Sequence, residues 1–79
     1  MPVIFKYKNF YIKFYSAEEG RMHVHALSLD GESIKIWLEP EIEIAQIDGV
    51  FNDKTVNEIL KKVKENESKC KTQWKNFFK

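Results

Sequence analysis

The sequence predicts an α+β fold in which a curved antiparallel sheet of four to five strands packs one face against a carboxyl-terminal helix. Two observations lead to this fold class. Apolar and polar residues alternate through the amino-terminal half, as in a β-strand, whereas from Asn52 onward apolar residues recur at steps of three and four, as in an amphipathic helix. Because 79 residues leave room for one core, we expect a single domain over 1–79, with a β-sheet half at 1–49 and a helical half at 52–78.

The first two predicted strands form a hairpin at the amino terminus. The runs VIFKY and FYIKFY are aromatic and β-branched, and only Lys8 and Asn9 separate them; Asn tolerates the positive φ that a two-residue turn requires. We expect this turn to gather one set of side chains on a buried face, namely Val3, Phe5, Tyr7, Phe10, Ile12 and Phe14. The opposite face then carries Ile4, Lys6, Tyr11, Lys13 and Tyr15.

Three further strands are predicted, near 22–29, 32–38 and 41–46. Asp30 and Gly31 form a turn signal between the first two of these strands, and Pro40 ends the second. In the third, Glu41 and Glu43 alternate with apolar residues and point outward. Outward charges and a nearby proline are typical of a strand at the edge of a sheet.

An amphipathic helix is predicted from about residue 53 to 77. Its apolar positions are Val56, Ile59, Leu60, Val63, Cys70, Trp74, Phe77 and Phe78. Asn52 is a good N-cap residue, and Asp53 in the first turn suits the helix dipole. Such a helix would be about 37 Å long, which is longer than one small sheet can cover. We therefore expect a kink or a break in the polar stretch KENESK, near 64–69.

Charge and composition narrow the class of protein. Residues 1–49 carry five Lys or Arg against eight Asp or Glu, whereas residues 50–79 carry eight Lys against four acidic residues. This basic excess is modest beside that of dedicated nucleic-acid binders. A single cysteine excludes an internal disulfide, and we find neither a signal peptide nor an apolar run that could span a bilayer. We expect a cytoplasmic protein without a membrane partner and without a cofactor.

One face of the predicted sheet is a candidate binding surface. Alternation along the strands turns a group of aromatic, imidazole and amine side chains away from the helix. The group consists of Tyr11, Lys13, Tyr15, His23, His25, Lys35 and Trp37. Aromatic rings and amines together suit a protein partner or, second, RNA. The same residues would also suit an ordinary solvent-facing sheet, since β-propensity alone enriches Tyr and Trp in strands.

His23 and His25, in the stretch RMHVHALS, are the only histidines and the candidate catalytic pair. Histidine acts as general base and acid near neutral pH, so the pair could cleave RNA. Both rings could also reach one metal ion, because alternate strand residues lie about 6.6 Å apart. A metal site needs three or four ligands, however, and spacing supplies no further one, so we predict no metal. The simplest interpretation is that the two rings only fill strand positions.

The cysteine and the aromatic residues near the carboxyl terminus are expected to serve packing. Cys70 lies on the apolar side of the helix, as a small buried hydrophobic residue rather than a nucleophile would. Trp74, Phe77 and Phe78 follow the helical period and are expected in the core. The alternative is an exposed aromatic end that docks a partner or a second copy of the chain.

Several motifs in their order resemble a known family. The opening MPVIFKYKNFYIKFYS is similar to a short hairpin start, MHVHA to a His-x-His strand, and IKIWLEP to a strand that ends in Trp-Leu-x-Pro. VFNDKTVNEIL and QWKNFF are similar to the start and the end of a helix. Together they resemble the small bacterial family catalogued as domain of unknown function 4160. The resemblance implies no established activity, but members of that family are often encoded beside another small protein, as in a toxin–antitoxin pair.

These observations predict a protein that acts by binding another macromolecule. The expected partner is a protein, in particular the product of an adjacent gene, which would make this chain the toxin-like component of a two-gene toxin–antitoxin pair. RNA as a partner and a homodimer remain open. The alternatives are a small ribonuclease that uses His23 and His25, and a metal-binding module. The sequence contains no recognisable Ser, His and Asp spacing of the kind found in hydrolases.

Overall fold

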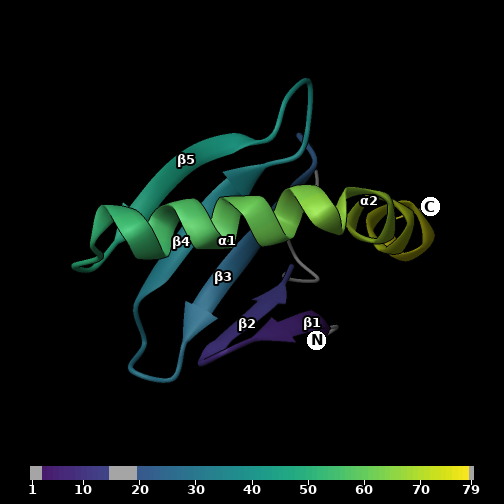
Figure 1. Cartoon of the computed structure of the whole chain (residues 1–79). Helices are drawn as coiled ribbons and strands as arrows, with labels where there is room; N and C mark the ends of the chain where they lie inside the picture. Colours follow the sequence, from purple (N-terminus) through teal and green to yellow (C-terminus); the bar gives the residue numbers. More distant parts are fainter. Residues whose placement is uncertain (1–2, 15–19, 79) are drawn as a thin grey trace.

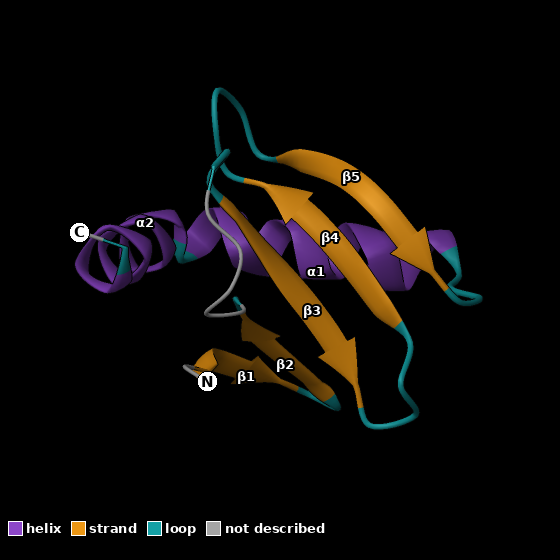
Figure 2. Cartoon of the chain, turned by 180° about the vertical axis from the view of Figure 1, so that it is seen from behind, coloured by secondary structure: helices purple, strands orange, loops and turns teal. Residues whose placement is uncertain are grey.

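The fold is a single antiparallel sheet followed by two helices, the first lying across one face of the sheet and the second beyond its end, which confirms the predicted α+β class (Figure 1). The structure is a computed structural model that describes residues 3–14 and 20–78. Its strands are β1 (Val3–Tyr7), β2 (Phe10–Lys13), β3 (His23–Ser28), β4 (Ser33–Trp37) and β5 (Glu43–Asp48), and its helices are α1 (Asp53–Glu65) and α2 (Glu67–Phe77). The strand order is β1-β2-β3-β4-β5, so each strand pairs with its neighbours along the chain. Seen from behind, the strands lie in front of α1 (Figure 2).

The core lies between the sheet and the helices. Alternate residues of the strands point into it, and they meet the apolar stripe of α1 and α2. Side chains without any exposed surface are Ile12, Phe14, Val24, Ala26, Ile34, Ile36, Leu38, Ile59, Val63 and Cys70. This arrangement confirms the predicted division into a face toward the helices and a face away from them.

The start of β1 departs from the predicted register. Phe5 pairs with Ile12 and Tyr7 pairs with Phe10 as expected, but Val3 pairs with Lys13 because the register shifts between Val3 and Phe5. An extra residue in one strand turns the residues beyond it to the other face. As a result Val3 is 50% exposed and Ile4 is 5% exposed, the reverse of the prediction. In the hairpin turn, Lys8 rather than Asn9 takes the positive φ, at 52°.

The strands around the other turns follow the prediction with small shifts. At the β3–β4 turn, Gly31 has a φ of +87°, and the Ser28 hydroxyl accepts the Asp30 and Glu32 backbone N–H groups at 3.2 and 3.0 Å. β5 forms an edge of the sheet but begins two residues later than predicted, at Glu43. Its register against β4 shifts, so that Ile36 pairs with Ile44 while Lys35 pairs with Gln46. This shift determines which side chains of β5 reach the face away from the helices.

The helix breaks inside the predicted stretch. Asn52 caps α1, since its side-chain oxygen accepts the Thr55 backbone N–H at 2.7 Å. At the other end, the Asn66 side-chain amide donates to the Lys62 carbonyl at 2.9 Å, and α2 starts at the next residue. In Figure 1, α1 lies across the sheet while α2 is seen nearly end-on. The change of direction keeps the apolar side of α2 against the end of the sheet.

We predict that the Asn52 cap contributes measurably to stability. Asn52→Ala removes the acceptor of an N–H at the helix start and should lower the free energy of unfolding by about 1 kcal/mol. Urea unfolding followed by circular dichroism measures this change. The control is Asn57→Ala, the same substitution at an exposed position within α1, where Ala is the better helix former. An equal loss of stability in both variants would contradict the assignment of the cap.

Candidate functional site

The cross-strand register places the predicted surface residues on the face of the sheet away from α1. Lys13 lies opposite His25, and His25 lies opposite Lys35, which pairs with Gln46. In the next row outward Tyr11, Leu27, Ser33 and Asp48 are neighbours, and at the other end His23 pairs with Trp37 and Trp37 with Glu43. We call this surface the open face, formed by Tyr11, Lys13, His25, Leu27, Ser33, Lys35, Trp37, Glu43, Gln46 and Asp48. Tyr15, also predicted for this surface, lies outside the described residues.

The two histidines occupy different environments. His25 is partly exposed, whereas His23 is only 3% exposed. The His23 ring centre lies 5.1 Å from that of His25, 5.7 Å from Trp37 and 5.1 Å from Trp74 of α2. Trp74 reaches His23 because the break between the helices turns α2 toward the start of β3. Of the two predicted catalytic residues, only His25 is partly exposed.

A hydrogen bond fixes the His23 ring. Its Nδ1 lies 2.7 Å from the Arg21 carbonyl oxygen. A carbonyl oxygen can only accept, so Nδ1 must carry the hydrogen and donate it. This bond and the two indole rings orient His23 as a packed polar residue at the end of the sheet. The sequence could not predict this role, because it depends on Trp74, far along the chain.

Two cations cover the Trp37 ring. The Arg21 guanidinium carbon lies 4.2 Å from the ring centre and the Lys35 Nζ lies 4.7 Å from it. Arg21 is held there by further contacts, since its Nε donates to the Glu39 carbonyl at 2.6 Å and its Nη2 donates to Glu43 Oε1 at 3.2 Å. The predicted binding surface did not include Arg21. Its position depends on the β4–β5 connection, which residue spacing does not place in space.

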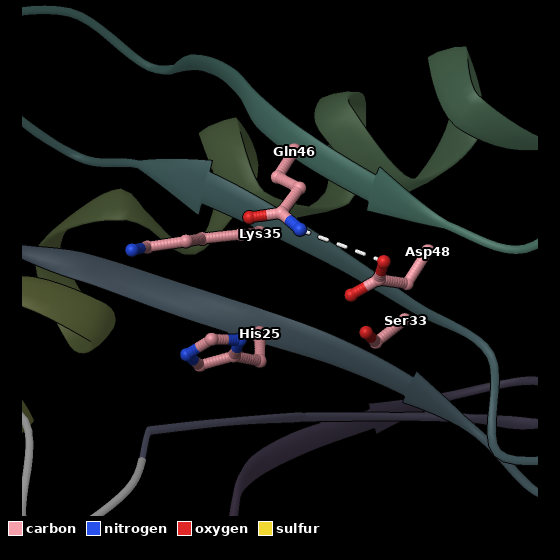
Figure 3. A pocket seen from close by; sticks show the side chains of 5 residues that line it. All are labelled: His25, Ser33, Lys35, Gln46 and Asp48. Atoms are coloured by element: carbon pink, nitrogen blue, oxygen red, sulfur yellow. Dashed lines mark hydrogen bonds between the residues drawn. The ribbon is translucent and has the colours of Figure 1, made fainter.

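A small polar pocket opens on this face between β3, β4 and β5. Its volume is about 230 Å³, and Figure 3 shows the five side chains that line it, His25, Ser33, Lys35, Gln46 and Asp48. Gln46 and Asp48 face the pocket because the register shift between β4 and β5 pairs them with Lys35 and Ser33. Sequence reasoning found His25 and Lys35 but missed the other three. The alternation of apolar and polar residues along β5 can be seen in the sequence, but the register shift between β4 and β5 cannot.

A family model described as Domain of unknown function (DUF4160) matches residues 9–75. The chain belongs to this family. The DUF4160 match runs from the hairpin turn into α2 and so includes all of the open face, and it confirms the resemblance seen in the motifs. No curated protein and no solved structure gives a significant match to the chain.

The part of the DUF4160 chain that the structure describes holds neither a cluster of metal ligands nor a helix that could span a membrane. Among residues 3–14 and 20–78, no group of three or more His, Cys, Asp or Glu side chains is close enough to hold a metal ion. His23 and His25 thus have no third ligand beside them in these ranges. Neither helix in these ranges has the length and apolar character that a bilayer crossing requires.

Cys70 is a packing residue of the DUF4160 core. Its side chain has no exposed surface, as predicted, and burial raises the pKa of the thiol from 9.0 to about 11. Because the thiolate is the reactive form, a raised pKa and lack of access both lower the reactivity of this thiol.

We predict slow modification of Cys70 in the native protein. At about pH 8 the raised pKa alone should lower the thiolate fraction, and with it the rate of reaction with a disulfide reagent, by about a hundredfold. The release of the coloured thiol measures this rate. The control is the same reaction in guanidinium chloride, where the chain is unfolded. Equal rates in the two conditions would show that Cys70 is accessible.

Proposed function

We propose that this protein acts by binding a partner protein through the open face. The observation that carries the proposal is the uneven cover of the sheet, in which α1 packs across one face and α2 lies at the end of the sheet, while partly exposed aromatic and charged side chains lie on the other face (Figures 1 and 2). Tyr11, Trp37 and Arg21 are of the residue types that are enriched in protein interfaces. Tyrosine and tryptophan bury a large area with few rotatable bonds, and the arginine guanidinium can donate several hydrogen bonds at once. Tyr11 lies on β2 and Trp37 at the end of β4, and the Arg21 guanidinium lies over the Trp37 ring.

The charges of the open face favour a protein over RNA. Lys13 and Lys35 share this face with Glu43 and Asp48, so the face is mixed rather than uniformly basic. A nucleic-acid surface gains most of its affinity from clustered positive charge and from free aromatic faces. Here the Trp37 ring already has Arg21 and Lys35 over it. A mixed surface of this kind suits a partner with charged residues of both signs.

We further propose that the partner is the product of an adjacent gene, and that the two form a cytoplasmic toxin–antitoxin pair of which this chain is the toxin-like component. Support comes from the family that the sequence resembles, whose members are often encoded beside another small protein. A small core is also consistent with a chain that gains stability from a bound partner. Homodimer formation is the outcome expected if the same face instead binds a second copy.

We predict that Lys13→Glu weakens capture of the adjacent gene's product by at least about tenfold. The substitution inverts a charge on the open face, at the β2 end of the cross-strand row that continues through His25 and Lys35, where a mismatched charge costs affinity. Titration calorimetry of the purified pair measures the dissociation constant. The matched control is Lys61→Glu on the exposed side of α1, which should bind as the unaltered protein does. Equal affinities for the two variants would place the partner elsewhere.

The ribonuclease alternative predicts a different result. Because His23 is buried, His25 would have to serve as the reactive histidine on the surface. We expect the purified protein to leave a labelled single-stranded RNA intact, and His25→Ala to change nothing. Electrophoresis of the RNA gives the answer. Cleavage that disappears in His25→Ala, with the fold retained by circular dichroism, would favour the ribonuclease over the binding protein.

A further inference from the structure

We propose that the pocket on the open face binds the guanidinium group of an arginine side chain presented by the partner protein. The inference rests on the proposed function and specifies one contact of the same surface. The pocket is lined by His25, Ser33, Lys35, Gln46 and Asp48 (Figure 3). Its chemistry, charge and size each point to this occupant.

Three of the five side chains that line the pocket, Ser33, Gln46 and Asp48, carry acceptor oxygens. The Gln46 side-chain amide donates to Asp48 Oδ1 at 3.5 Å, which turns the Gln46 carbonyl oxygen away from Asp48 (Figure 3). The Ser33 hydroxyl lies beside the Asp48 carboxylate in the same view. A carboxylate, an amide carbonyl and a hydroxyl therefore present lone pairs from two neighbouring strands. A group with several fixed donors matches such a set better than one with a single donor.

The Asp48 charge is not neutralised by its basic neighbour. Lys35 lines the pocket with its stem, but its Nζ lies over the Trp37 ring at 4.7 Å and points away from Asp48 (Figure 3). Within the described ranges, the ion pairs involve other carboxylates, such as Glu43 with Arg21. Asp48 thus provides the negative charge that a cationic side chain would meet. An anion in the pocket would be repelled by the same carboxylate.

The size of the pocket limits its occupant. At about 230 Å³ it is smaller than the roughly 300–1,000 Å³ of pockets for cofactors and drug-sized ligands. A side chain fits this size. The His25 ring forms one wall, and a planar guanidinium can stack on a ring while its edge donates to oxygens, which an ammonium group cannot do. Arginine therefore fits better than lysine.

The experiment titrates the labelled protein with N-acetyl-arginine amide, which carries a guanidinium and no free carboxylate. We expect saturable shifts of the Ser33, Gln46 and Asp48 backbone amide signals in nitrogen–proton correlation spectra. For so small a probe the dissociation constant should be of the order of 1 mM. N-acetyl-glutamine amide, a neutral probe of the same backbone, should cause no saturable shift at these residues.

Two variants locate the binding. Asp48→Asn keeps the size of the side chain and removes its charge, and it should weaken the arginine probe by about tenfold or more. Asp53→Asn makes the same change at the exposed start of α1 and should have no effect on the titration. Equal binding by the Asp48→Asn variant, or equal shifts with the glutamine probe, would overturn the pocket assignment.

The titration with the arginine probe tests the pocket, and the capture experiment tests the open face, so failure of one proposal can be told apart from failure of the other. If the arginine probe does not bind but Lys13→Glu still weakens capture of the partner, the pocket assignment is wrong and the open face remains the binding surface. If the probe binds in the pocket but neither Lys13→Glu nor Asp48→Asn affects capture, the partner does not use this face. In that case the pocket is a guanidinium site outside the partner interface, and the proposed function is wrong.

Discussion

The rest of the structure depends on one constraint, which is that the chain has enough helix to cover only one face of its sheet. Each strand must then send alternate side chains into a single shared core, and the remaining ones, apart from His23 beside Trp74, lie on the face that α1 leaves uncovered. The buried isoleucines of β2 and β4 and the apolar stripe of α1 satisfy this constraint from both sides. The uncovered side chains are consequently what another molecule would meet first.

The break at Asn66 allows the second helix to contact both the core and His23 at the start of β3. A straight continuation of α1 would carry its last apolar residues beyond the sheet. Because α2 turns, Trp74 packs at 5.5 Å from Phe14 in the core and at 5.1 Å from His23 at the start of β3. Phe77 and Phe78 also contact Phe14, at 5.2 and 5.5 Å. Phe78 packs against the core as expected, but the expectation that Phe77 is a core residue is wrong, because Phe77 at the end of α2 is 43% exposed. One aromatic cluster thus stabilises the end of the sheet and makes the two histidines unequal.

Local patterns predicted most of the fold, and long-range pairing accounts for what they missed. The strand alternation, the Asn52 cap and the break near 64–69 each depend on residues close together in sequence, and all three are confirmed. The exchange of Val3 and Ile4 at the start of β1 came from an irregular register that only the neighbouring strand reveals. The alignment of Gln46 with Lys35 has the same origin. For this reason the candidate surface was predicted in its central part but not at its β5 side.

The strand order has a consequence for how the protein acquires its structure. In this meander every strand pairs with the strand before it, so most sheet contacts join segments that are close in the chain. Folding rates rise as the sequence separation of contacts falls, and the loop-closure entropy of each hairpin is small. Such a sheet can assemble hairpin by hairpin from the amino terminus, but its apolar face stays uncovered until α1 and α2 arrive last. Because the helices are synthesised last, the apolar face of the sheet is exposed and prone to aggregation until they pack on it.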